Sequence, residues 1–146
     1  MNCKMICLEC GEEFVYAEGR ESKCPVCRSI IEIDEKIEPL ILTLNRSDFF
    51  TAKSCEGHGW DSGWPHPFVT LYFHKDYKKL DKVLQEYNKS VAKEQRWKIE
   101  RHPKLVIEKW LIPVETNKRL EKIQRSIRPL TDFLQENALK QKHALK

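Results

Sequence analysis

The sequence predicts an α+β protein in two parts, a small metal-binding module over residues 1–34 and an α+β domain over residues 35–146. Two CxxC pairs lie in the first part. In the second part, helical spacings of apolar residues alternate with short β-branched and aromatic runs, in the order α-β-β-α-β-β-α. Paired strands between helices are typical of a small antiparallel or mixed sheet with helices on one face.

The first part is defined by four cysteines, Cys7, Cys10, Cys24 and Cys27, which form two CxxC pairs separated by 13 residues. A CxxC turn directs two thiolates at one ion, at about 2.3 Å, and two such turns complete a tetrahedral shell of four sulfurs. Gly11 permits the positive φ of a sharp turn after the first pair. Since such a shell has no open position, we predict one structural zinc ion, with iron as the alternative metal. Residues 7–27 resemble the zinc-ribbon and rubredoxin-like knuckle families, and the first part is therefore called the zinc ribbon below.

The first helix of the α+β domain is predicted from apolar residues at helical spacing. These residues are Ile37, Leu40, Ile41 and Leu44. Pro39 suits the first turn of this helix, and Asn45 is predicted to end it. A strand over residues 49–55 follows, then a glycine-bearing loop over residues 56–67. The next strand, residues 68–73, is so rich in apolar residues that we expect both of its faces to be buried.

The second half of the domain repeats the helix-and-hairpin order. Asp76 is a natural N-cap for a helix whose apolar stripe consists of Tyr77, Leu80, Leu84, Tyr87 and Val91. Residues 97–101 and 105–112 are predicted strands joined by a turn. In the last helix, Pro129 is predicted to break or kink the chain. The apolar residues on either side of that proline are Leu120, Ile123, Ile127, Leu130, Phe133 and Leu134.

Charge is distributed unevenly along the chain. Residues 1–38 hold five Lys/Arg and nine Asp/Glu, a net charge of −4, whereas residues 39–146 hold 21 and 13, a net charge of +8. Much of the positive charge lies on two helices, at Lys78, Lys79, Lys82, Lys89 and Lys93 and at Lys118, Arg119, Lys122, Arg125 and Arg128. If the protein binds a polyanion, we therefore expect the second part to bind it.

The sequence favours a cytoplasmic protein that does not contact a membrane. No apolar run approaches the roughly 18 residues that a membrane helix needs, and the N-terminus shows no secretion signal. Thiols stay reduced in the cytoplasm, so six cysteines there indicate metal ligands before disulfides.

The loop after the first strand of the domain is the candidate ligand site. Its candidate ligand-binding residues are Ser54, Cys55, Glu56, Gly57, His58, Trp60, Trp64 and His66. Glycines at a strand end let backbone approach a ligand closely, and the two tryptophans offer faces for stacking a base. We expect a binding or regulatory protein with a nucleotide, RNA or DNA ligand at residues 54–66.

Three other interpretations of this loop remain open. Cys55 and His58 could act as a nucleophile and its base. Together with His66 and His74 they could instead hold a second metal ion. In the third interpretation, Cys55 is a small buried residue and Gly57 shapes the turn.

Residues 40–73 also resemble two groups of proteins through this loop. Ser54, Cys55 and Gly57 match the Ser-Cys-x-Gly motif of the tRNA wybutosine-synthesis methyltransferase family, which has serine and arginine at the positions of Glu56 and His58. The resemblance implies an alternative function, an RNA-modifying enzyme that uses S-adenosylmethionine. Short bacterial and phage proteins with a Ser-Cys-x-Gly-His motif are also similar, so a phage-encoded protein is one of the origins that this resemblance implies.

A further alternative is an adaptor that binds a protein partner. In this interpretation the partner docks on the ribbon surface at Glu12, Glu13 and Phe14, or on the apolar stripe of the last helix.

Overall fold

The computed structural model describes residues 2–7, 9–17, 23–31, 33–57, 67–71, 77–92, 95–100, 104–107, 121 and 124–144. An N-terminal hairpin is formed by β1 (Asn2–Ile6) and β2 (Glu13–Ala17). The chain then forms α1 (Glu38–Arg46), β3 (Thr51–Cys55), β4 (Phe68–Leu71), α2 (Tyr77–Lys89), β5 (Trp97–Glu100), β6 (Lys104–Ile107) and α4 (Ile127–Ala144). This order confirms the predicted α+β class and its α-β-β-α-β-β-α sequence of elements.

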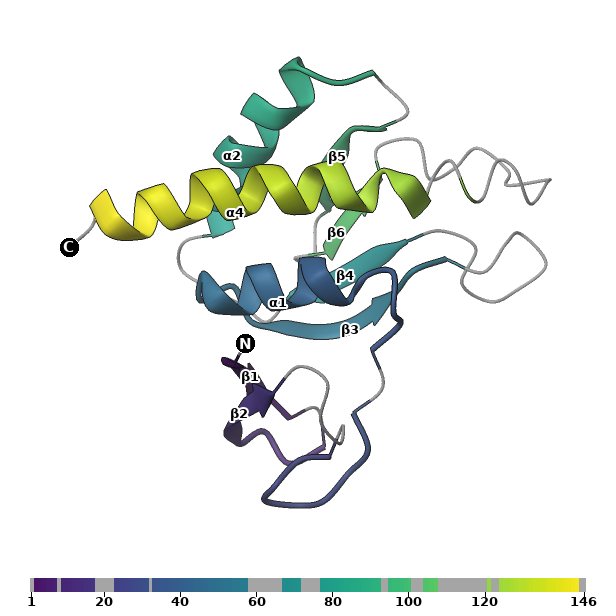
Figure 1. Cartoon of the computed structure of the whole chain (residues 1–146), viewed down its shortest axis with the longest axis vertical. Coiled ribbons are helices and arrows are strands. Elements are labelled where there is room, and N and C mark those ends of the chain that lie inside the picture. Colours follow the sequence, from purple (N-terminus) through teal and green to yellow (C-terminus); the bar gives the residue numbers. More distant parts are fainter. Residues whose placement is uncertain are drawn as a thin grey trace.

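The domain is built on a four-stranded sheet with the strand order β3-β4-β6-β5. Each pair of neighbouring strands is antiparallel, so the sheet is antiparallel rather than mixed. In Figure 1, α1 and α4 lie in front of this sheet, and the β1-β2 hairpin lies beyond the edge strand β3. The helix α4 contacts both α1 and α2, which joins the two halves of the domain.

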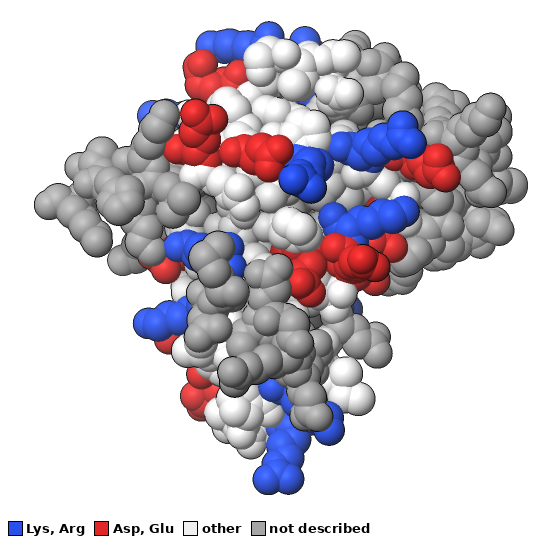
Figure 2. Space-filling model, in the orientation of Figure 1, with Lys and Arg blue, Asp and Glu red and all other residues white. Residues whose placement is uncertain are grey.

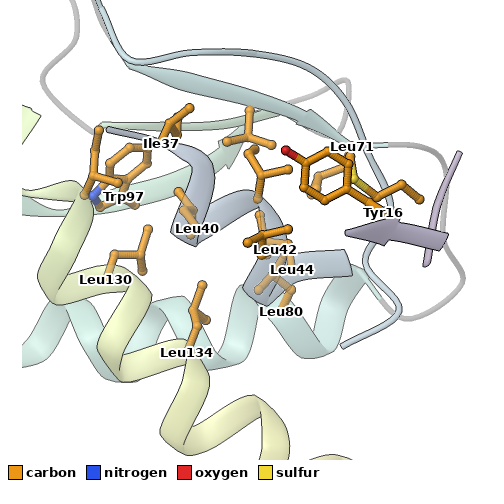
Figure 3. Packing of buried hydrophobic residues seen from close by; sticks show 14 of the residues in the cluster. Tyr16, Ile37, Leu40, Leu42, Leu44, Leu71, Leu80, Trp97, Leu130 and Leu134 are labelled. Carbon is orange, nitrogen blue, oxygen red and sulfur yellow. The ribbon is translucent and has the colours of Figure 1, made fainter. Parts of the chain in front are cut away.

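The core gathers side chains from α1, α4 and the sheet. The predicted stripe of α1, Ile37, Leu40, Ile41 and Leu44, is fully buried. Figure 3 shows Leu130 and Leu134 on the side of α4 that faces Leu40, with Trp97 of β5 nearby. Burial of large apolar side chains is the main stabilising term in a domain of this size, so the packing of α1 on α4 holds the domain together.

The ribbon shares this core instead of standing apart from it. Met5, Phe14 and Tyr16 of the hairpin belong to the same cluster of buried residues as the α1 stripe. The Tyr16 hydroxyl also donates a hydrogen bond to Glu38 Oε2 at 3.2 Å, at the first residue of α1. The hairpin is therefore packed directly against α1.

The end of α1 differs from the prediction by one residue. The helix continues through Asn45 to Arg46, and Asp48, with φ at 65°, takes the left-handed conformation that ends it. Asn45 is buried, and its amide donates to Ile41 O at 2.7 Å and to Thr51 Oγ1 at 2.9 Å. Its role is therefore to tie the end of α1 to the start of β3.

The break predicted at Pro129 lies three residues earlier, at Ser126, so Ile127 belongs to the helix after the break. Gln124 and Arg125 are helical, Ser126 is a turn, and α4 begins at Ile127, which places Pro129 in the first turn of the helix. A proline ring clashes with the carbonyl four residues before it, here that of Arg125, so the interruption falls where that clash is avoided. Three residues of the predicted helices, Asp76, Leu120 and Ile123, lie outside the described residues.

Candidate metal centre

The two cysteine pairs form turns with the same backbone hydrogen bonds. The Gly11 N–H donates to Cys7 O at 2.9 Å, and the Arg28 N–H donates to Cys24 O at 2.8 Å. In each turn, the N–H of the first cysteine then donates to the carbonyl five residues later, at 3.0 Å in both. The two knuckles are therefore copies of one local structure.

The residue after each knuckle has a positive φ, which is 73° at Gly11 and 62° at Arg28. The sequence predicts the first through its glycine. It does not predict the second, because a non-glycine residue rarely adopts this conformation and an arginine carries no signal for it.

The four sulfurs lie at the spacing of a tetrahedral metal site. Sγ of Cys7 is 3.6 Å from Sγ of Cys27, Sγ of Cys10 is 3.8 Å from Sγ of Cys24, and all four sulfurs lie within 4.8 Å of one another. Four sulfurs about 2.3 Å from one ion would be separated by about 3.8 Å. The four cysteines are free thiols, and they are the one cluster of at least three His, Cys, Asp or Glu with metal-site spacing among the described residues. This geometry fits one structural zinc ion and is consistent with a zinc-ribbon-like knuckle.

The thiols of the cluster differ in acidity. The Ser29 hydroxyl, 3.1 Å from Cys27 Sγ, lowers the pKa of Cys27 to about 6, and the Cys27 N–H lowers the pKa of Cys24. At Cys10, the Glu12 N–H favours the thiolate, but partial desolvation of the sulfur and the three neighbouring thiols raise the pKa to about 12. Thiolates this close repel one another, so a bound cation is needed for all four to be ionised at neutral pH.

One side of the cluster continues into the core and the other faces solvent. Cys7 and Cys24, the first cysteine of each knuckle, are 3% and 0% exposed and belong to the buried cluster. Cys10 and Cys27 are exposed. A metal ion here would therefore connect the core to the outer turns of the ribbon, which is a structural role.

The structure describes only the first half of the predicted ligand loop. Ser54 is paired with Val69 at the end of β3, Cys55 is buried, and Gly57 has a φ of 87°. His58, Trp60, Trp64, His66 and His74 lie outside the described residues. The second metal site and the Cys55–His58 pair therefore stay predictions.

Cys55 has the environment of a structural thiol. Burial raises its pKa, and the negative charge of Asp34 acts in the same direction. The Gly57 N–H, 3.3 Å from Cys55 Sγ, acts in the opposite direction but does not outweigh them. Cys55 is therefore a neutral thiol at neutral pH, the less nucleophilic form.

The end of β3 is held by hydrogen bonds from two distant segments. The Glu56 N–H donates to Asp34 Oδ2 at 3.0 Å, and the Lys36 N–H donates to Glu56 Oε2 at 2.9 Å. From the other side, Gln124 Nε2 donates to Gly57 O at 2.7 Å, and Lys36 Nζ donates to Gln124 Oε1 at 2.8 Å. Sequence reasoning missed Lys36 and Gln124, because nothing local signals a contact across 88 residues.

One residue of the predicted adaptor surface, Phe14, is buried in the structure. Glu12 and Glu13 are exposed, but Phe14 is 7% exposed and belongs to the core. Side chains alternate between the two faces of a strand, and the next residue, Val15, is the exposed one, at 60%. Phe14 therefore anchors the ribbon to the domain and is not available to a partner.

No protein-family model, curated protein or solved structure matches this chain. The resemblance to the zinc-ribbon families therefore depends on the four-cysteine geometry, and the resemblance of residues 40–73 to the wybutosine family stays a prediction. Within the described part of the chain, no helix is long and apolar enough to cross a membrane.

Proposed function

We propose that this chain is a nucleic-acid-binding protein, in which a zinc ion stabilises the ribbon and the basic α+β domain contacts the phosphates. The observation that carries the proposal is the opposite net charge of the two ends of the chain, −4 over residues 1–38, which include the ribbon, and +8 over residues 39–146, which make up most of the domain. A phosphate chain is attracted by the second part and repelled by the first.

The zinc ion in this proposal is structural and takes no part in binding the nucleic acid. Four thiolates fill a tetrahedral shell, so no position is open for a phosphate or a water. Zinc is favoured over iron because it is the common metal of paired CxxC knuckles in structural sites. Exposed Glu9, Glu12 and Glu13 on the ribbon would also repel a phosphate.

The positive charge of the domain is available at its surface. The described Lys and Arg side chains of the domain that are exposed are Lys36, Lys53, Lys78, Lys82, Lys89, Lys98, Arg125 and Arg128. Figure 2 shows Lys and Arg side chains interleaved with Asp and Glu side chains on the face that α4 crosses. Because the two signs alternate on this face, phosphates would be held by local groups of cations and not by a broad positive surface.

The test is fluorescence anisotropy with a labelled single-stranded RNA and the matching DNA, titrated at several KCl concentrations. We expect binding whose affinity falls steeply with salt, with a slope of log K against log salt of about −0.7 for each phosphate neutralised. A chain that binds neither strand, or binds with no salt dependence, would contradict the proposal.

A further inference from the structure

An open hollow of about 410 Å³ lies where the segment after the ribbon meets the start of α4. It is lined by Lys36, Glu121, Gln124, Arg125 and Arg128. Three cations and one carboxylate give this lining a positive balance. Its volume lies within the range of small-ligand sites, about 300–1,000 Å³.

Lys36 is held at the hollow by a neutral hydrogen-bond partner, so this hydrogen bond does not offset its charge. Its Nζ donates to Gln124 Oε1 at 2.8 Å, and an amide oxygen is neutral. Gln124 is 8% exposed, and its Nε2 is fixed on Gly57 O at 2.7 Å. The buried glutamine therefore positions the ammonium group while leaving its charge, and its other hydrogens, available to an anion.

The arginines at the hollow are only weakly neutralised by the neighbours that the structure describes. Arg125 is exposed. Arg128 Nε is 3.8 Å from Asp132 Oδ2, but the two side chains are 83% and 62% exposed, so solvent screens this pair strongly.

We propose that this hollow binds a phosphate group of the nucleic acid or nucleotide ligand. Arg125 and Arg128 would contact its oxygens through their planar guanidinium groups, and Lys36 would add a third positive charge. Gln124 is a positioning residue, which acts through Lys36. The inference rests on the proposed function and gives the phosphate a location near Gly57, which belongs to the loop that the sequence predicts as the ligand site.

The test compares two double variants that remove the same charge. R125Q/R128Q alters the hollow, and K78Q/K82Q removes two exposed lysines of α2. We expect R125Q/R128Q to weaken binding of the labelled single strand about tenfold or more, with a salt slope shallower by about 0.7, the value for one phosphate. K78Q/K82Q should change the affinity much less. Circular dichroism and the urea midpoint of each variant check that it is folded.

A third variant tests the positioning role. Gln124→Leu removes the amide that holds Lys36 but leaves every cation in place. We expect weaker binding with an unchanged salt slope, which a loss of charge would not give. Full affinity in Gln124→Leu would contradict the role of Gln124.

Competition distinguishes the two sources of the phosphate. Displacement of the labelled strand by a nucleoside diphosphate, lost in R125Q/R128Q, assigns the hollow to the terminal phosphate of a nucleotide. Resistance to that competitor, together with weak strand binding by R125Q/R128Q, assigns it to a phosphodiester of the chain.

Two results would overturn the inference, and they are distinct. Equal loss of affinity in the two double variants would mean that binding is spread over the domain, so the hollow would not be a phosphate site while the proposed function would stand. A wild-type protein that binds neither the strands nor the nucleotide would remove the proposed function and the inference together.

Discussion

The four-cysteine cluster and the hollow at Gln124 are assembled from the chain in opposite ways. Each knuckle takes two ligands from four consecutive residues and fixes them with its own backbone hydrogen bonds. The hollow takes Lys36 from one segment and its other lining residues from another, and the hydrogen bond that joins them spans 88 residues. The four-cysteine cluster therefore depends on local turns and a metal ion, whereas the hollow depends on the packed core.

This difference predicts that the two regions can be damaged separately. Loss of the metal should disorder the ribbon first, because the outer cysteines have few other contacts to hold them. Loss of core packing should unfold the domain and the hollow with it, since α4 is held by the core. The variants below test this separation, from the largest expected effect to the smallest.

Removal of a buried ligand is expected to have the largest effect. Cys24→Ser takes one thiolate from the cluster, and structural zinc contributes on the order of 10 kcal/mol of binding free energy in small zinc modules. We expect Cys24→Ser to lose the metal, as measured by the metal-to-protein ratio in elemental analysis, which also identifies zinc or iron. Cys55→Ser, at a buried thiol outside the cluster, is the control and should keep one metal ion per chain. A full metal complement in Cys24→Ser would show that the ligand set is wrong.

Truncation of the α1–α4 contact is expected to have the next largest effect. Leu130 is 0% exposed, and Leu130→Ala should lower the free energy of unfolding by about 2–5 kcal/mol. Val15→Ala, at an exposed residue of the ribbon, should change it by less than about 0.5 kcal/mol. Urea unfolding of the metal-loaded variants measures both. Equal effects would mean that the core does not hold the domain as the structure indicates.

The same division explains what could be predicted from sequence. The four-cysteine cluster, the α1 stripe and the helix break near Pro129 follow from spacing and backbone sterics within a few residues. The structure brings the four sulfurs together at the spacing of one metal site and buries the α1 stripe. The sequence predicts Phe14 on the surface, because alternation along β2 does not say which of its two faces packs against α1, and that contact is tertiary. Lys36 and Gln124 each look like ordinary polar residues, and only the fold brings them together.

A smaller effect is expected from the buried thiol of the domain, and it depends on pH. Burial raises the pKa of Cys55 above that of an unfolded thiol, about 8.5, so the folded state holds its proton more tightly. The contribution of this proton to the free energy of unfolding is complete below about pH 8.5, and it is lost as the pH rises through the raised pKa of Cys55. Urea unfolding between about pH 8 and pH 10 should show a decline in the free energy of unfolding that is shallower in Cys55→Ser.

A second buried group, Tyr87, has its pKa raised by burial as well, and it lowers the free energy of unfolding only above about pH 10. Parallel curves for the wild type and Cys55→Ser would contradict this account.

The smallest effect compares the two knuckles with each other. Both need a positive φ at the residue after the second cysteine, but only the first has glycine there. Gly11→Ala should destabilise the metal-bound ribbon by about 1 kcal/mol through its backbone alone, since an added Cβ would meet no atom within 4 Å. Arg28→Gly should stabilise it by a similar amount, about 1 kcal/mol, because the strain of an L-residue is removed.

Competition with a chromogenic chelator measures both changes as zinc affinity, because folding of the ribbon is coupled to binding of the metal. Arg28→Ala is the control: it removes the guanidinium group but keeps an L-residue at the same φ, so it should not gain affinity. If Arg28→Ala and Arg28→Gly gained equally, the side chain and not the backbone would be the cause. A gain in Arg28→Gly alone would show that the second knuckle keeps the geometry of the first against the preference of its own residue, and that the metal and the core impose it.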